Sequence, residues 1–335
     1  MIKTNYNGSL EEPIITRQFV EHLAEMMVRD EKLVYLDADL MFAWVMDDLL
    51  ERFPDRMIHC GIAECNMVSV AAGMSAAGLK PLIHSFAVFI SRRVFDQIYL
   101  SGAYGRNSMN IIGSQPGYTQ GYNGGTHMAF EDIAMMRTVP NACVFDMVDG
   151  VQFNNLIGQT KDMDGIYYYR TALQDNISIY EKGSDFKIGK GNILREGTDA
   201  TVIACGRLVA NALKAAELLL SEGISIRVVD MFTIKPLDEE LVIDSAEKTG
   251  VIVTAENHSV YGGLGSAVAE TLAEQCPVPV CRMGMKDRFG EVGPESYLCL
   301  LYTSTADQFK RKEIKKHMQY AQNRTIIIDI TYKMQ

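Results

Sequence analysis

Glu64 is the residue with the clearest chemical potential. It lies between Gly61 and Asn66, at the start of a predicted helix over 63–77 that is rich in alanine, glycine and serine. A glutamate in a first helical turn usually just complements the helix dipole. Small residues let this helix approach its neighbours closely, so we expect it to be buried. A carboxyl group there would be poorly solvated and could share a proton with a heterocyclic nitrogen.

Two further patterns are candidates for ligand contacts. Phe86 and Phe89 have helical i, i+3 spacing, which alone favours an ordinary core position. Beside Glu64, we interpret them instead as a clamp that stacks on a flat ring. His127 follows Gly124 and Gly125 in a predicted loop. A lone histidine is more often structural, but one in such a loop is positioned for ligands.

Standard catalytic signatures are missing from the sequence. It has no G-x-S-x-G elbow, no G-x-x-x-x-G-K-[ST] loop and no H-E-x-x-H metal site. The glycine run at 262–265 lacks the third glycine of a dinucleotide fingerprint, so we interpret it as a tight strand-to-helix turn. Seven scattered cysteines with no C-x-x-C pair indicate buried thiols in a reducing compartment rather than a disulfide framework or zinc site.

Short apolar runs alternate with helical patterns along the chain, which predicts an α/β protein with largely parallel sheets. We predict two domains, each a mostly parallel sheet flanked by helices. The predicted boundaries are an N-terminal extension at 1–12, a first domain at 13–175, a linker at 176–198 and a second domain at 199–335. The predicted strands are 33–36, 81–85, 109–113, 143–147, 166–169, 201–205, 226–229 and 251–254. The first helix has Phe19, Leu23 and Met27 on one stripe, with Thr16 as its candidate N-cap.

Charge and hydropathy exclude two classes of partner. The formal net charge of −10 argues against a nucleic-acid-binding surface. The start, MIKTNYNGSLEEP, lacks an apolar signal core, and no segment reaches 18 uninterrupted apolar residues. We therefore expect a cytoplasmic protein that does not contact a membrane.

Several segments, in this order, resemble the transketolase family. They are GIAECNM at 61–67, SFAVF at 85–89 with RVFDQ at 93–97, GGTH at 124–127 with EDIA at 131–134, DMFTIKPLD at 230–238 and DRFGE at 287–291. The similarity runs from about residue 12 to about residue 310. It is to the pyrimidine-binding and C-terminal domains of a transketolase, supplied as a separate subunit.

The resemblance implies a thiamine diphosphate site. Glu64 falls on the family glutamate that bonds a ring nitrogen of the aminopyrimidine and so favours the imino tautomer. Phe86 and Phe89 would face the pyrimidine, and Asp39 is also assigned to the cofactor. His127 would contact substrate hydroxyls or the C–C bond being broken.

Substrate recognition departs from the family pattern. The family phosphate cluster uses two arginines, a serine and a histidine. Arg17 and Arg170 match the arginines, although each could equally form an ordinary salt bridge. Ala43 replaces the serine, Gln115 the histidine, and Asn123 an aspartate before the Gly-x-Thr-His run. A modified ketose or another anionic tail therefore becomes credible as substrate.

The diphosphate half of the site is predicted to come from another chain. Transketolases hold the diphosphate through a metal bound by Gly-Asp-Gly and a following asparagine, and this sequence lacks that motif. We predict no metal ligands here and an N-terminal transketolase-like partner subunit that binds Mg²⁺ or Ca²⁺. The expected assembly is a heterotetramer in which this chain also self-associates.

The predicted activity is transfer of a two-carbon ketol unit between anionic sugars. One alternative is the beta subunit of a 2-oxo-acid dehydrogenase, which shares the glutamate motif but not the Gly-Thr-His run. A synthase joining pyruvate to a sugar phosphate is a weaker alternative, because those enzymes are usually single chains. A non-catalytic partner chain is the alternative from a different class. The segment 325–332 extends beyond the family pattern and has no assigned role.

Overall fold

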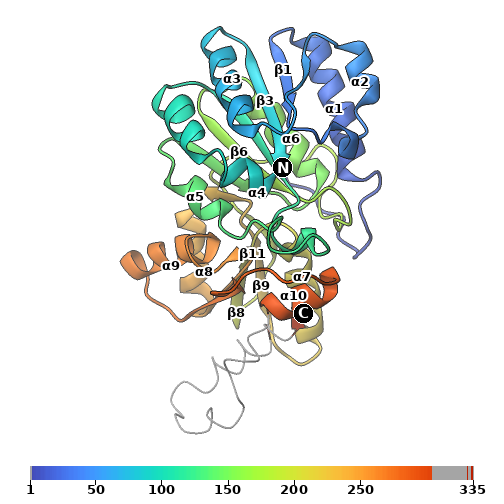
Figure 1. The fold of residues 1–335 in the computed structure, drawn as a ribbon. Coiled ribbons are helices and arrows are strands. Elements are labelled where there is room, and N and C mark those ends of the chain that lie inside the picture. Colours follow the sequence, from blue (N-terminus) through green and yellow to red (C-terminus); the bar gives the residue numbers. More distant parts are fainter. Residues whose placement is uncertain (1, 304–329, 331–332, 335) are drawn as a thin grey trace.

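The computed structural model describes residues 2–303, 330, 333 and 334, so most of the segment 325–332 lies outside the described residues. Figure 1 shows two halves stacked one above the other, each built on a central sheet with helices on both faces. One sheet has seven strands and the other has five. Both are mostly parallel, and the predicted fold class is confirmed.

The larger sheet contains β1 (Leu33–Asp37), β2 (Met57–His59), β3 (Lys80–Phe86), β4 (Met109–Ser114), β5 (Ala142–Asp146), β6 (Ile166–Thr171) and β10 (Thr233–Lys235). Its order is β10-β5-β6-β4-β3-β1-β2. The smaller sheet contains β7 (Asn192–Arg195), β8 (Ala200–Ala204), β9 (Ile226–Asp230), β11 (Ile252–Ser259) and β12 (Val280–Met285), in the order β12-β11-β8-β9-β7. Among the described strands of the two sheets, only β10 and β7 pair antiparallel with their neighbours.

The helices are α1 (Ile15–Arg29), α2 (Asp47–Arg52), α3 (Glu64–Ala76), α4 (Ala87–Ser91), α5 (Asp132–Thr138), α6 (Gly150–Thr160), α7 (Leu208–Leu220), α8 (Glu239–Thr249), α9 (Leu264–Gln275) and α10 (Glu295–Thr303). Short turns of other helix types occur at η1 (Met41–Trp44), η2 (Gln97–Tyr104) and η3 (Gly117–Gln120). The predicted stripe is the buried face of α1, but Thr16 is not its N-cap. The helix begins at Ile15 with Ile14 as its N-cap, two residues before the predicted one, and Thr16 is buried. No helix in the described part of the chain is long and apolar enough to cross a bilayer.

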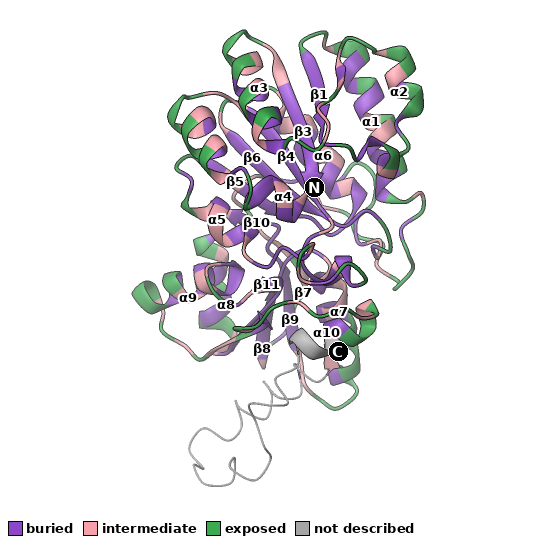
Figure 2. Cartoon of the chain, in the orientation of Figure 1, coloured by how far each residue is buried: buried purple, intermediate pink, exposed green. Residues whose placement is uncertain are grey.

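Each sheet is covered on both faces, which explains the continuous apolar runs in the sequence. All five residues of β1 are buried, and alternate side chains enter opposite layers. Tyr35 lies in the layer with Phe19 of α1 and Phe153 of α6, whereas Leu36 lies in the layer with Val68 of α3. Figure 2 shows the result, with buried strands and helices that expose only their outer sides.

The two halves interlock. β10 comes from the range predicted for the second domain, yet it pairs with β5 at the edge of the first sheet. β7 lies inside the range predicted as linker. Two bridges tie the N-terminal residues to the same range, Thr4 with Tyr180 and Leu10 with Ile177. The carboxyl ends of the two sheets also meet, because the Cys205 thiol after β8 lies 3.3 Å from an Asp146 carboxylate oxygen at the end of β5.

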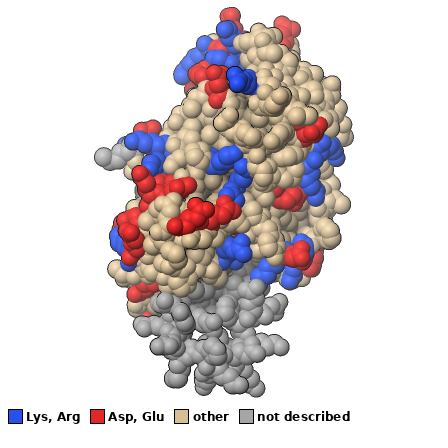
Figure 3. Space-filling view, turned by 90° about the vertical axis from the view of Figure 1, so that its left-hand side faces the viewer, with Lys and Arg blue, Asp and Glu red and all other residues tan. Residues whose placement is uncertain are grey.

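Charged side chains are unevenly spread over the surface. On the face shown in Figure 3, acidic and basic side chains form mixed groups, and a wide area between them is uncharged.

Candidate active site

Glu64 is the first residue of α3 and its side chain is almost fully enclosed, with 2% of the residue exposed. Gly61 supports the turn into the helix, because its φ of 68° is in the left-handed region that favours glycine. The Glu64 carboxylate accepts a hydrogen bond from Arg93, with 2.7 Å between Oε2 and Nη1. A buried carboxylate with one charged partner is thus held at the carboxyl edge of the larger sheet.

The two phenylalanines come from the strand and the helix that follow α3. Phe86 ends β3 and Phe89 is in α4, and their ring centroids are 6.2 Å apart. Both are half-buried rather than core residues. The guanidinium carbon of Arg93 lies 4.5 Å from the centre of the Phe89 ring. Arg93 therefore connects the Glu64 carboxylate to the aromatic face.

His127 completes the group from the loop between η3 and α5. Its ring meets Phe89 edge-on, with centroids 5.3 Å apart, and lies 6.4 Å from Phe86. The His127 Nδ1 and the Thr126 Oγ1 are 2.9 Å apart. The structure thus brings together four predicted residues that are up to 63 positions apart, from Glu64 to His127.

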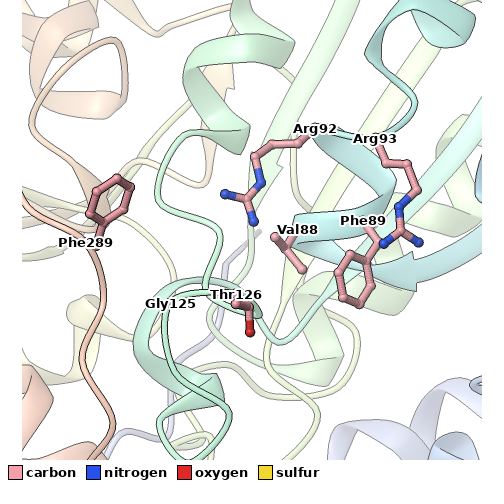
Figure 4. A pocket seen from close by; sticks show the side chains of 7 residues that line it. All are labelled: Val88, Phe89, Arg92, Arg93, Gly125, Thr126 and Phe289. Carbon is pink, nitrogen blue, oxygen red and sulfur yellow. The ribbon is translucent and has the colours of Figure 1, made fainter.

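A cavity of about 850 Å³ opens beside Phe89, and Figure 4 shows the residues around it. Its lining residues are Val88, Phe89, Arg92, Arg93, Gly125, Thr126 and Phe289. Phe289 is 93% exposed and reaches the cavity from the loop after β12, opposite Phe89. The Arg92 Nε is 2.9 Å from a Glu131 carboxylate oxygen. The sequence motifs alone assigned no role to Arg92, Arg93 or Phe289, although Arg93 and Phe289 lie in segments that carry the family resemblance.

Arg170 does not fit its predicted role in substrate binding. Its guanidinium is fully buried and lies 2.8 Å from Asp132 and 2.9 Å from Asp146. Burial lowers the pKa of Arg170, but the two carboxylates more than offset this, and the pKa lies above its ordinary value. Its donors are committed inside the protein, so we correct the prediction and assign Arg170 to the junction between the two halves.

Arg17 is also outside the cavity. Its side chain is 73% exposed on α1, where it pairs with Glu21 one turn away. This is the ordinary helical salt bridge that was the alternative to anion binding, and such pairs contribute little to stability.

Three other predicted residues lie after strands of the larger sheet or in the His127 loop, without lining the cavity. Gln115 follows β4 and its Oε1 accepts from the Leu173 N–H at 3.3 Å. Asn123 is exposed, four positions before His127. The exposed Asp39 carboxylate lies 2.9 Å from His59 Nε2. Their roles stay predictions.

The glycine run at 262–265 forms the turn from β11 into α9, as predicted. Its backbone N–H groups already have an acceptor, because the Glu256 carboxylate accepts from Leu264 at 2.7 Å and Gly265 at 2.8 Å. Burial raises the pKa of Glu256 to about 7. The turn holds a carboxylate of its own chain and is not placed to hold a phosphate.

The residues present fit a flat, nitrogen-containing ring. Glu64 offers a buried acceptor and Phe89 an aromatic face, and the cavity lies beside Phe89 and the Arg93 side chain that covers both groups. Within the described ranges, no three His, Cys, Asp or Glu side chains are grouped to hold a metal ion.

Comparison with known proteins gives this geometry a family. Residues 13–167 match the transketolase pyrimidine-binding domain, and residues 189–308 match the transketolase C-terminal domain. The chain belongs to the transketolase family. It is 46% identical over 306 residues to the 6-deoxy-6-sulfo-D-fructose transketolase subunit of Clostridium sp. (strain MSTE9), covering 91% of this chain and 95% of that one. This transketolase chain is 36% identical over 272 residues to an apulose-4-phosphate transketolase subunit of Phocaeicola vulgatus, covering 81% and 87%.

A solved structure has the same extent. The protein described as a split gene transketolase, inactive beta4 tetramer, is 36% identical to this transketolase chain, with a TM-score of 0.80 and 96% of both chains covered. This chain is accordingly a transketolase subunit, a transferase chain of a split enzyme.

Proposed function

We propose that this chain activates thiamine diphosphate in a split transketolase that moves a two-carbon ketol unit between anionic sugars. The observation that carries the proposal is the buried Glu64 carboxylate beside Phe89 and His127, in a pyrimidine-binding domain. Thiamine diphosphate, when bound, supplies the carbon nucleophile that accepts the ketol unit.

Glu64 would hold the proton at the ring nitrogen of the pyrimidine. The carboxylate is removed from water, so a hydrogen bond to that nitrogen is stronger than it would be in solution. Phe89 would stack on the ring, which contributes about 0.5–1.5 kcal/mol beyond area burial. Phe86, at the end of β3 and next to Phe89, would narrow the space for the ring, which we call the cofactor slot.

His127 would bind substrate oxygens. Its Nδ1 is engaged with Thr126, which leaves Nε2 to face a ligand. Its edge-on contact with Phe89 places the imidazole against the aromatic wall of the slot. His127 follows Thr126, which lines the cavity, so a sugar bound there would lie close to the imidazole and to the cofactor.

We infer a partner subunit that carries the diphosphate and its Mg²⁺ or Ca²⁺, in a heterotetramer. Large apolar side chains are exposed around the site, namely Ile62 before Glu64, Tyr122 in the His127 loop and Phe289 at the cavity. Exposed apolar groups of this kind mark interfaces. The solved relative is described as an inactive beta4 tetramer of a split gene transketolase, which supports both self-association and the need for a partner.

We infer that the substrate is a ketose carrying a sulfonate or phosphate. One relative is named for a sulfo-sugar and another for a sugar phosphate, and the identity is higher to the first. Arg92 is the cavity residue placed to meet an anion, once its bond to Glu131 is exchanged.

No disulfide joins the seven cysteines, all in the described part of the chain, and this supports a cytoplasmic location.

The test is Glu64→Gln, assayed with the partner subunit, Mg²⁺ and both classes of ketose. We expect a loss of about 100-fold or more in turnover, because an amide cannot hold the proton. Glu21→Gln, the same change on the exposed face of α1, is the matched control. Near-normal turnover of Glu64→Gln would remove Glu64 from the mechanism. No turnover of the wild-type mixture on any ketose would favour a non-catalytic chain.

A further inference from the structure

The loop that carries His127 takes its shape from the C-terminal half of the chain. Near its start, the Asn257 side chain donates to the Pro116 carbonyl oxygen and accepts from the Tyr118 N–H, both at 3.1 Å. Gly117, between them, has a φ of 56°, and a Cβ added there would lie 2.0 Å from the Asn257 Oδ1. The backbone at 116–118 is therefore wrapped around this one amide, which is buried.

The other end of the loop is attached to the same strand. The Ser259 N–H donates to the Phe130 carbonyl oxygen at 2.8 Å. Asn257 and Ser259 are two residues apart near the end of β11. The last residues of this one strand of the smaller sheet thus hold both ends of the loop, at residues 116–118 and at residue 130.

The middle of the loop is packed against the segment after β12. The Gly293 N–H donates to the Gly121 carbonyl oxygen at 3.0 Å. A Cβ on Gly125 would lie 2.8 Å from the Gly290 carbonyl oxygen, and a Cβ on Gly290 would lie 2.2 Å from the Met128 sulfur. The two segments touch backbone to backbone at Gly125 and Gly290, and the Met128 side chain packs on Gly290 just after His127, so we expect a shift of the 290–293 segment to move the imidazole.

We propose that Asn257 is a positioning residue for His127, and that the C-terminal half acts on the reaction by holding the 116–130 loop in register. This rests on the substrate-binding role proposed for His127. The amide does both jobs at once, because its N–H₂ holds Pro116 while its oxygen holds Tyr118. The two hydrogen bonds of the Asn257 amide are to residues 116 and 118, whereas Glu64 and Phe89 lie on α3 and α4, so we expect the amide to act on the loop more than on the cofactor site.

The experiment is a double-mutant cycle of Asn257→Ala and His127→Ala in the assembled split enzyme. We expect Asn257→Ala to lower kcat/KM for the ketose by about 10- to 100-fold, the scale of a small misplacement in an active site. The Kd for thiamine diphosphate with Mg²⁺ should stay within about twofold. In the His127→Ala background, Asn257→Ala should cost less than about twofold, because the group it positions is gone.

Two variants make the cycle specific. Asn192→Ala is the matched control, since its amide donates to the Tyr180 hydroxyl at 3.1 Å on the other edge of the same sheet. It should leave kcat/KM unchanged. Gly290→Ala adds a methyl group against Met128 and so displaces the loop through the 290–293 segment. It should give the same loss of kcat/KM and the same unchanged cofactor Kd, which keeps the test valid even if Asn257→Ala fails to fold.

The outcomes separate the two ideas. Equal losses of Asn257→Ala in both backgrounds, or a parallel loss in cofactor affinity, would show a general structural effect and overturn the positioning role. An active Asn257→Ala and Gly290→Ala beside an impaired His127→Ala would also overturn it. A fully active His127→Ala would instead refute the proposed role of His127, and the positioning role would fail with it.

Discussion

Arg93 occupies the place where a cofactor ring is expected, and its removal should tighten cofactor binding. The guanidinium bonds the Glu64 carboxylate and covers the Phe89 ring. These are the two groups proposed to bind the pyrimidine. The ring can reach them only if Arg93 moves, so the energy of the Arg93 contacts is lost when the cofactor binds. Arg93→Met removes that competing interaction and keeps much of the side-chain bulk.

The size of the effect follows from the burial of the two partners. At 2.7 Å and an effective dielectric constant of about 20, the Coulomb attraction is on the order of 6 kcal/mol. Arg93 is 43% exposed, so water screens the pair and also solvates the arginine when it leaves. Exposed pairs contribute about 0.2–1 kcal/mol. Because Glu64 is buried, we assign the Arg93–Glu64 pair a net energy of about 1–2 kcal/mol. Its removal corresponds to a cofactor Kd lower by about 5- to 30-fold.

The assay is calorimetric titration of thiamine diphosphate and Mg²⁺ into the assembled subunits. Arg92→Met is the matched control, because Arg92 lines the same cavity and is exposed to a similar degree but pairs with Glu131 instead of Glu64. Its cofactor Kd should stay within about twofold of wild type. A weaker Kd for Arg93→Met would refute the reasoning, since it would show that Arg93 supports the bound cofactor. An unchanged Kd would show that the pair contributes no competing energy.

Three further predictions concern the slot and the stability of the fold. Phe89→Leu should weaken the thiamine diphosphate Kd by about 2- to 12-fold, the loss of one ring-stacking contact, in the same calorimetric assay. Arg170→Met should lower the free energy of unfolding by about 3–5 kcal/mol in urea titrations, because Asp132 and Asp146 keep buried charge without their cation. Burial raises the pKa of Glu11 to about 7, so the folded state holds a proton that the unfolded state releases at lower pH, and stability falls as the pH rises from about 4.5 to about 7. Glu11→Gln should therefore raise Tm at pH 8 and change it little at pH 5; an equal gain at both would contradict this.

The positions of Glu64 and the two phenylalanines could be predicted from sequence because these residues lie in short local motifs. The small-residue helix begins at Glu64, and β3 places Phe86 at the carboxyl edge where the predicted clamp was expected. The contact between Arg93 and Glu64 could not be predicted, because the two residues are 29 positions apart and nothing in the sequence around the arginine indicates it.

The predicted substrate-binding role of Arg170 was wrong for a different reason. Its place at the end of a strand suits an anion site, but successive side chains of a strand point to opposite faces. Whether a cation there meets ligand or protein depends on what lies across the sheet. Here Asp132 and Asp146 neutralise it, and neither carboxylate can be paired with it from sequence spacing alone.

The strand β10 has a consequence for building chimeras. A chain cut within 176–198 would lose the strand that covers β5, the amide of Asn257 and the Asn257 carbonyl oxygen that Arg170 bonds. Grafting a C-terminal half from another relative would have to transplant all three contacts together with their partners in the first half. The two halves should therefore be exchanged together. Chimeras of subunits of this type should fold far more often when the crossover lies before residue 13 or after residue 308 than when it lies between the two matched regions.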